Sequence, residues 1–289
     1  MKIYITGING QLGNDIRIQA LQQGYEVKGC GRQKHEMDYY QQIDISDYEQ
    51  CKKILEEKPD IIIHCAAWTD VDGAENVQVQ NTVYKCNVEA TRNITKISQQ
   101  INSKLVYISS DYVYGGFGQE LNTEETKPMP LNFYGQTKYQ GELEALKYTN
   151  SFILRISWLF GRYGRNFVST ILGLSMTYPK LTVITDQIGR PTYTTDLSKL
   201  ILEMIKTDKY GIYNVSNEGP FISWYDYTKY ILKDKNIEIC GETSEEYYKD
   251  TIGANRPLNS RLDTSKLIKN GFTPLPSWTD AVDRYIQGL

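Results

Sequence analysis

The chain lacks several features that would place it in other classes of protein. Its five cysteines include no Cys-x-x-Cys pair, so the sequence predicts free thiols in a reducing compartment and no metal-ligand cluster. Lysine and arginine total 32 against 35 for aspartate and glutamate, and the net charge of -3 argues against nonspecific nucleic-acid binding. No apolar run approaches ~18 residues and no signal-peptide pattern opens the chain, so we expect a cytoplasmic protein without a membrane span.

The N-terminal segment predicts a βαβ unit. Residues 2–6 form a short apolar strand, residues 15–23 a helix, and residues 25–30 a second strand. The intervening residues 7–13 carry three glycines with the spacing G-x-x-G-x-x-G. Glycines at this turn let the backbone approach a pyrophosphate held at the helix N-terminus. The unit therefore predicts dinucleotide binding, with a plain glycine-rich turn as the alternative.

The end of the second predicted strand favours NADPH over NADH. Gly31-Arg32 occupies the position where an acidic residue would hydrogen-bond the ribose 2′-hydroxyl of NAD, and no acid follows until Glu36. An arginine there accommodates the 2′-phosphate of NADP. The sequence therefore predicts NADPH with Arg32 as a ligand, and NADH is the alternative if Arg32 is only a solvated loop residue.

Two later strands end in side chains suited to a ligand site. Residues 59–67 predict a buried strand that ends in Ala66 and Ala67, and residues 104–110 predict another that ends in two serines. Open α/β sheets bind ligands at the carboxyl ends of their strands, and small side chains there leave room. Because successive residues of a strand point to opposite faces, only one of the two serines is expected to face the cofactor.

Tyr134 and Lys138 stand four residues apart, so both side chains share one face if the segment is helical. The lysine charge would favour the phenolate and lower the pKa of the tyrosine from about 10, which gives a proton donor near neutral pH. Ser109 or Ser110, about 24 residues before Tyr134, would complete a Ser-Tyr-Lys set for acid–base chemistry. In isolation the pair would more often mark an exposed helix face.

Motif-like segments follow one another over nearly the whole chain. They are residues 6–13, 66–75, 109–114, 134–142, 155–161, 166–167, 186–192, 223–226 and 256–260. These segments resemble the motifs of dTDP-4-dehydrorhamnose reductases, which belong to the extended short-chain dehydrogenases/reductases. Ser110 takes the place of a catalytic threonine in that family and keeps its hydroxyl.

The resemblance implies an α/β fold, an NAD(P)-binding Rossmann doubly wound parallel sheet with a smaller C-terminal α/β substrate domain. Residues 1–160 are expected to form the cofactor domain, joined by about residues 197–216, and residues 161–289 mainly the substrate domain. The elements expected later in the chain are helices 82–100, 166–176, 197–206 and 224–233 and strands 181–184 and 210–216.

The implied reaction is the NADPH-dependent reduction of the C4 keto group of a nucleotide-linked 4-keto-6-deoxyhexose. By resemblance it converts dTDP-4-dehydro-β-L-rhamnose to dTDP-β-L-rhamnose, a step of rhamnose and cell-surface polysaccharide biosynthesis. Tyr134 would protonate the developing alkoxide, and Ser110 would polarise the carbonyl. Lys138 would lower the pKa of Tyr134 and hold the nicotinamide ribose.

The resemblance also implies two sets of binding residues. Substrate contacts are expected from Ser110, Asp111, Trp158, Asn166 and Arg256. Cofactor contacts are expected from Gly7, Asn9, Gly10, Gln11, Leu12, Arg32, Asp44, Ile45, Ala66, Ala67, Thr69, Tyr134 and Lys138. Arg256 or Arg190 could neutralise the substrate diphosphate, although an ion pair at the surface or between domains would equally explain either arginine.

Two polar residues have both a family role and a structural alternative. Asp44 would accept a hydrogen bond from the adenine amine, although Ser46 or Asp47 could cap the helix expected at residues 48–57. Asn87 would support the active-site backbone, although it would equally fit a polar position on a helix. The sequence leaves both choices open.

Two other functions compete with the reductase. A nucleotide-sugar epimerase or dehydratase would use the same scaffold, but a dehydratase needs a second carboxylate after the triad hydroxyl, where Asp111 is followed by Tyr112. A non-catalytic NADP-binding regulatory subunit is the other alternative, and the Ser110, Tyr134 and Lys138 set counts against it. We expect no resident metal, and a homodimer is compatible with the sequence.

Overall fold

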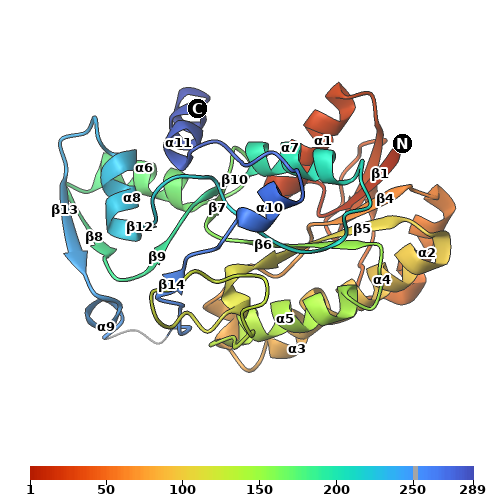
Figure 1. Cartoon of the computed structure of the whole chain (residues 1–289), viewed down its shortest axis with the longest axis horizontal. Coiled ribbons are helices and arrows are strands. Elements are labelled where there is room, and N and C mark those ends of the chain that lie inside the picture. Colours follow the sequence, from red (N-terminus) through yellow and green to blue (C-terminus); the bar gives the residue numbers. More distant parts are fainter. Residues whose placement is uncertain (250–252) are drawn as a thin grey trace.

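The structure, a computed structural model, describes residues 1–249 and 253–289. At its centre lies a parallel sheet with the strand order β11-β6-β5-β4-β1-β2-β3 (Figure 1). Its strands are β1 Lys2–Thr6, β2 Glu26–Gly31, β3 Tyr40–Gln42, β4 Ile61–His64, β5 Lys104–Ser110, β6 Ser151–Ile156 and β11 Gly211–Val215. The predicted doubly wound α/β fold is confirmed.

Helices cover both faces of this sheet because its strands are apolar on both sides. Ile3 and Ile5 of β1 pack into one buried cluster, whereas Tyr4 between them packs into a second cluster on the opposite face. The first face is covered by α1 Gln11–Gln22 and α7 Thr194–Met204 (Figure 1). The other face is covered by α2 Tyr48–Glu57, α4 Ala90–Ile101 and α5 Phe133–Ala145.

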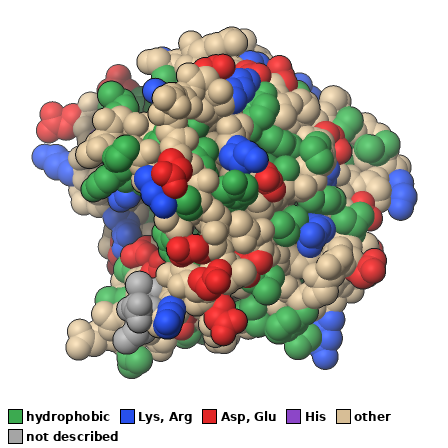
Figure 2. All heavy atoms as spheres, turned by 90° about the vertical axis from the view of Figure 1, so that its left-hand side faces the viewer, with side chains coloured by type: hydrophobic (Ala, Val, Ile, Leu, Met, Phe, Trp, Pro, Cys, Tyr) green, Lys and Arg blue, Asp and Glu red, His purple; other side chains and the backbone are tan. Residues whose placement is uncertain are grey.

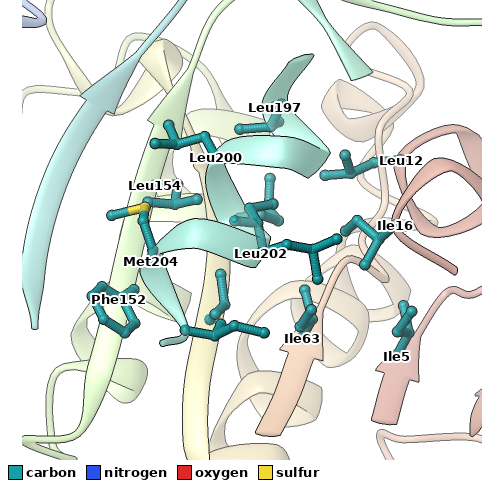
Figure 3. Packing of buried hydrophobic residues seen from close by; sticks show 14 of the residues in the cluster. Ile5, Leu12, Ile16, Ile63, Phe152, Leu154, Leu197, Leu200, Leu202 and Met204 are labelled. Carbon is teal, nitrogen blue, oxygen red and sulfur yellow. The ribbon is translucent and has the colours of Figure 1, made fainter. Parts of the chain in front are cut away.

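Helix α7 supplies much of the first cluster. Figure 3 shows Leu197, Leu200 and Leu202 pointing from α7 toward side chains of α1 and of the sheet. The N-terminus of α7 is fixed to α1 by polar contacts, because the hydroxyls of Thr194 and Thr195 donate to the carboxylate of Asp15. The packing of α7 on α1 thus closes one face of the sheet.

The rest of the chain forms mainly a smaller lobe, on the left of Figure 1. Its elements are α6 Phe167–Thr177, β8 Lys180–Ile184, β9 Ile188–Gly189, β12 Ile222–Ser223, α8 Trp224–Ile231, β13 Glu238–Glu242, α9 Ser244–Tyr247, β14 Asn259–Ser260 and α11 Trp278–Gln287. Short elements elsewhere are η1 Gly73–Glu75, α3 Gln80–Tyr84, η2 Lys85–Glu89, η3 Asp111–Val113, β7 Leu159–Phe160, β10 Thr192–Tyr193 and α10 Ser265–Lys269. A third cluster rich in aromatic side chains holds the smaller lobe together.

The chain returns to the first sheet after it has entered the smaller lobe. Strand β11 pairs with β6, from Gly211 opposite Phe152 to Val215 opposite Ile156, and so extends the sheet by one edge strand. This return involves the segment that the sequence assigned to the first domain. The boundary at residue 160 and the roles of the two domains stay predictions.

Several elements differ from their expected bounds. Helix α1 begins at Gln11, directly after the glycine turn, instead of at residue 15. The helix expected at residues 82–100 is divided, because the π-helix η2 separates α3 from α4. Helix α7 begins at Thr194 instead of at residue 197, and the Thr194 hydroxyl bonds Asp15.

Figure 2 looks onto the end of the molecule that holds α6, α8 and β13, where acidic and basic side chains are interspersed with hydrophobic ones. Within the part of the chain that the structure describes, no helix combines the length and the apolar character needed to span a bilayer.

The packing of α7 can be tested with Leu202→Ala. Leu202 is fully buried in the cluster of Figure 3, so its truncation should lower the free energy of unfolding by about 2–5 kcal/mol. Leu143→Ala on α5 is the control, because Leu143 is 45% exposed and its loss should change the free energy by no more than about 0.5 kcal/mol. Urea unfolding curves measure both, and equal losses would contradict the packing described.

Candidate active site

One large cavity, of about 920 Å³, lies at the carboxyl ends of the central strands. Both lobes contribute to its wall. Of the predicted site residues, it is lined by Gly7, Asn9, Gly10, Gln11, Leu12, Arg32, Asp44, Ile45, Ala66, Ala67, Thr69, Ser110, Asp111, Tyr134, Lys138 and Trp158. The structure thus brings together all of them except Asn166 and Arg256.

The glycine turn leaves no room for side chains. Gly7 has a φ of +69°, and its carbonyl accepts a hydrogen bond from Gly10 N at 2.8 Å. A Cβ on Gly13 would lie only 2.3 Å from the Gly7 carbonyl oxygen. Gly10, the N-cap of α1, offers no side-chain acceptor, so the first N–H groups of α1 are available to an anion in the cavity.

The structure distinguishes the ligand role expected of Asp44 from the helix-capping role considered for its neighbours. Asp44 lines the cavity, and its Oδ1 accepts hydrogen bonds from the backbone N and the hydroxyl of Ser46. Asp47 is the N-cap of α2, because its side chain accepts from Glu49 N. Asp44 is therefore not the helix cap, and its contact with adenine stays a prediction. Arg32 also lines the cavity and its side chain is exposed.

The choice between the two serines follows from their partners. Ser109 Oγ donates to Glu142 Oε2 at 2.9 Å, and the same carboxylate is paired with the buried guanidinium of Arg155. Ser110 Oγ instead donates to Asp111 Oδ1 at 3.0 Å and lies within reach of the Tyr134 phenol, whose pKa it lowers. Ser110 is therefore the serine beside Tyr134.

Lys138 lies almost fully buried under the cavity, with 3% of its surface exposed. Its ammonium donates to the backbone carbonyl of Ile108 at 2.6 Å and lies 4.5 Å from the ring centroid of Tyr107. Burial lowers the pKa of Lys138 from 10.5 to about 8, although nearby Cys86 and Glu142 oppose this shift. The carbonyl and the ring fix the ammonium where the helix presents it.

The pKa of Tyr134 differs from the expectation that Lys138 would lower it. Burial raises the pKa of the phenol well above its ordinary value, and the hydrogen bond with Ser110 offsets only part of the rise. The physical reason is that the cavity wall and the ring of Tyr112, 5.5 Å away, keep water from the phenolate. Tyr134 is consequently held in its protonated form, as a proton donor must be.

Asn87 ties the loop after β4 to the helix that carries Tyr134. It lies in η2, where its Oδ1 accepts from Trp68 N at 2.8 Å and its Nδ2 donates to Thr137 Oγ1 at 3.0 Å. Thr137 in turn donates to the Tyr134 carbonyl at 2.9 Å. Of the two roles considered for Asn87, support of the active-site backbone is the one that the structure bears out.

An aromatic wall bounds the other end of the cavity. Trp158 adopts a φ of +49°, unusual for a bulky residue, and its ring stacks on Trp224 with centroids 3.7 Å apart. Phe167 packs on Trp224 at 4.3 Å, and Tyr227 completes the wall. Sequence reasoning found Trp158 but gave Phe167, Trp224 and Tyr227 no role. The only signal for Trp224 was its place in the motif at residues 223–226.

Asp111 is a buried carboxyl group with one oxygen free. It is 3% exposed, its Oδ1 accepts from Ser110, and its Oδ2 has no partner among residues 1–249 and 253–289. Burial raises the pKa of Asp111 from 3.8 to about 6. The free oxygen can therefore accept a hydrogen bond from a hydroxyl group of a ligand.

Three predicted residues have partners elsewhere. Asn166 caps α6 and donates to Gly161 O at 2.8 Å, so its amide serves the protein backbone. Arg256 donates to both carboxylate oxygens of Asp72, at 2.9 and 2.7 Å, and Arg190 is buried against Glu218. None of the three lines the cavity. For both arginines the ion-pair alternative describes this structure, because acidic side chains distant in sequence meet them in the fold.

No group of three or more histidine, cysteine, aspartate or glutamate side chains arranged to hold a metal ion occurs in the described ranges, 1–249 and 253–289.

Comparison with known proteins gives a consistent set of relatives. The family model described as "RmlD substrate binding domain" matches residues 1–289. The spore coat polysaccharide biosynthesis protein SpsK of Bacillus subtilis is 34% identical, covering 99% of this chain and 97% of that protein. A dTDP-4-dehydrorhamnose reductase of Aggregatibacter actinomycetemcomitans is also 34% identical, covering 97% of each chain. The crystal structure of dTDP-4-dehydrorhamnose reductase from Bacillus anthracis in complex with NADP superposes with a TM-score of 0.91 at 36% identity, covering 100% and 99%.

The buried carboxyl of Asp111 predicts a pH dependence of stability. Because its pKa is higher in the folded than in the unfolded protein, the folded state binds the proton more tightly, and the free energy of unfolding falls as pH rises from about 4 to about 6. Asp111→Asn abolishes this titration and should raise the free energy of unfolding near pH 8 by on the order of 2 kcal/mol.

Urea unfolding at about pH 4 and about pH 8 checks this expectation. Asp234→Asn is the matched control, because Asp234 is exposed and its loss should leave the pH dependence unchanged. If the free energy of unfolding of Asp111→Asn depended on pH as that of the wild-type protein does, the burial of this carboxyl would carry no energetic cost.

Proposed function

Because this chain belongs to the RmlD substrate binding domain family, we propose that it reduces dTDP-4-dehydro-β-L-rhamnose to dTDP-β-L-rhamnose with NADPH. The observation that carries the proposal is the meeting of Ser110, Tyr134 and Lys138 at one cavity whose wall also contains the glycine turn. The named activity of its relatives and the NADP complex of the Bacillus anthracis protein support it.

The residues at the sheet edge fit a dinucleotide. The turn at Gly7, closed against α1 without space for side chains, and the uncapped first turn of α1 suit a pyrophosphate. Arg32, exposed at the end of β2 and lining the cavity, suits the 2′-phosphate of NADPH. When bound, NADPH supplies the hydride for the carbonyl carbon.

Tyr134 acts as the proton donor in this proposal. Its phenol is held protonated by burial and faces the Ser110 hydroxyl, so one proton can pass from the phenol to the C4 oxygen as negative charge develops there. Ser110 donates a hydrogen bond to the same oxygen and polarises the carbonyl. We assign the buried Lys138 ammonium to the nicotinamide ribose.

The substrate side of the cavity suits a sugar. Asp111 offers a free carboxylate oxygen to a hydroxyl, and the Trp158 ring offers an apolar face for the hexose. We assign both as substrate contacts. Contacts of Asn166 and Arg256 with the substrate would require them to leave the partners they have in this structure. We also infer that the protein works in the cytoplasm.

Tyr134→Phe tests the proton donor. Loss of the hydroxyl should lower kcat about 10²–10⁴-fold, because the alkoxide must then take its proton from water. The affinity for NADPH, measured by isothermal titration calorimetry, should change little. Tyr139→Phe on the same helix is the control, since Tyr139 does not line the cavity and its loss should leave kcat unchanged. Turnover is followed by NADPH absorbance with dTDP-4-dehydro-β-L-rhamnose, and near-normal turnover by Tyr134→Phe would remove Tyr134 from the mechanism.

Arg32→Ala tests cofactor choice. Loss of a charge-assisted contact of about 1.5–3 kcal/mol should raise the KM for NADPH roughly tenfold or more and leave the KM for NADH nearly unchanged. Lys34→Ala is the control, because Lys34 is a nearby cation that is 77% exposed, pairs with Glu36 and lies outside the cavity. Equal changes for both cofactors would mean that Arg32 does not read the 2′-phosphate.

A further inference from the structure

Four arginine or lysine side chains line the cavity, and two of them, Lys85 and Arg165, have no role in the mechanism above. Arg32 follows β2, Lys85 is the first residue of η2, and Lys138 is buried on α5. Arg165 stands two residues before Phe167, which forms the aromatic wall with Trp158 and Trp224. It belongs to the segment 161–166 that joins β7 to α6.

The guanidinium of Arg165 is free to bind a ligand. The side chain is exposed, and within residues 1–249 and 253–289 it makes no hydrogen bond, ion pair or ring contact. Arg190 and Arg256 differ from Arg165 because each is paired with an acidic side chain and neither lines the cavity. The cation expected for a diphosphate is therefore found at Arg165 instead.

The backbone around Arg165 is fixed although its side chain is free. The next residue, Asn166, donates to Gln11 Oε1 at 3.1 Å and to Gly161 O at 2.8 Å, and it caps α6. A Cβ on the preceding residue, Gly164, would lie 3.8 Å from the Cβ of Gln11. Arg165 is thus held between the start of α1 and the aromatic wall, so that a long, flexible side chain emerges from a rigid base.

We propose that Arg165 binds the diphosphate group of a ligand in this cavity. Guanidinium groups bind phosphate oxygens through two parallel hydrogen bonds, which matches a single arginine facing a diphosphate. This inference rests on the proposed function, since both ligands named there carry a diphosphate. The substrate diphosphate is favoured, because Arg165 borders the aromatic wall, while the first turn of α1 already offers N–H groups to the diphosphate of NADPH.

The test measures binding, so it does not depend on turnover. Isothermal titration calorimetry of the full-length protein is carried out with dTDP, with thymidine, which lacks the diphosphate, and with NADP⁺. Arg165→Ala should weaken dTDP binding about tenfold or more at low salt and leave thymidine binding unchanged, because only the charged contact is lost. Arg165→Lys should recover part of the loss, since the charge stays but the paired hydrogen bonds do not.

Arg162→Ala is the matched control. Arg162 is an exposed arginine of the same segment but does not line the cavity, so its removal changes the net charge equally and should leave dTDP binding unchanged. Thermal unfolding of each variant, followed by circular dichroism, checks that the fold is intact, as expected for two exposed side chains.

The outcomes separate the two sources of the diphosphate and the two proposals. Weaker binding of dTDP alone assigns Arg165 to the substrate, and weaker binding of NADP⁺ alone assigns it to the cofactor. Wild-type affinity of Arg165→Ala for both ligands, an equal loss for thymidine and dTDP, or a wild-type protein that binds neither ligand would overturn the proposal. A wild-type protein that binds dTDP and NADP⁺ but reduces no dTDP-linked keto sugar would overturn the proposed function and leave the Arg165 assignment standing.

Discussion

The parallel pairing of β1, β4, β5 and β6 is the constraint on which the site depends. In this register Thr6 lies opposite His64, His64 opposite Tyr107, and Ser110 opposite Ile156, so the chain leaves the sheet at the same edge each time. The glycine turn, the two alanines after β4 and the Ser110-Asp111 pair are therefore neighbours, although more than a hundred residues separate the first from the last. A shift of one residue in the pairing of β5 would exchange the faces of Ser109 and Ser110, and Ser110 would then no longer lie beside Tyr134.

Beneath this edge of the sheet, the protein buries several charged side chains, and only some of them are paired with a side chain of opposite charge. The Arg155 guanidinium is paired with Glu142 and also bonds Tyr114, so this ion pair below the cavity is fully satisfied. Among the residues that the structure describes, Lys138 has only a carbonyl and a ring as partners, and Asp111 keeps one oxygen without a partner. Burial therefore shifts the pKa of each toward its neutral form. Lys138 and Asp111 line the cavity, whereas the Arg155–Glu142 pair does not, as expected where stability is given up for ligand binding.

Sequence reasoning worked where the chemistry is local. The glycine spacing within residues 7–13 and the Tyr134–Lys138 pair depend on neighbours a few positions away, and the structure places both at the cavity. It was less successful where partners come from far along the chain. Neither the ion pair of Arg256 with Asp72 nor the rise in the pKa of Tyr134 can be read from spacing, because both follow from which groups the tertiary fold packs nearby. The π-helix at Lys85–Glu89, within the helix expected at residues 82–100, was also not predicted from the sequence.

At the junction between the lobes, hydrogen bonds join the side of the cavity that holds the glycine turn to the side that carries Arg165. Asn166 bonds Gln11 across the junction, and the hydroxyls of Thr194 and Thr195 bond Asp15, so the start of α1 is held by segments from the second half of the chain. The turn expected to hold the cofactor and the loop that carries Arg165 therefore share one rigid support. If cofactor and substrate bind as proposed above, each contacts a segment that these hydrogen bonds join to the other.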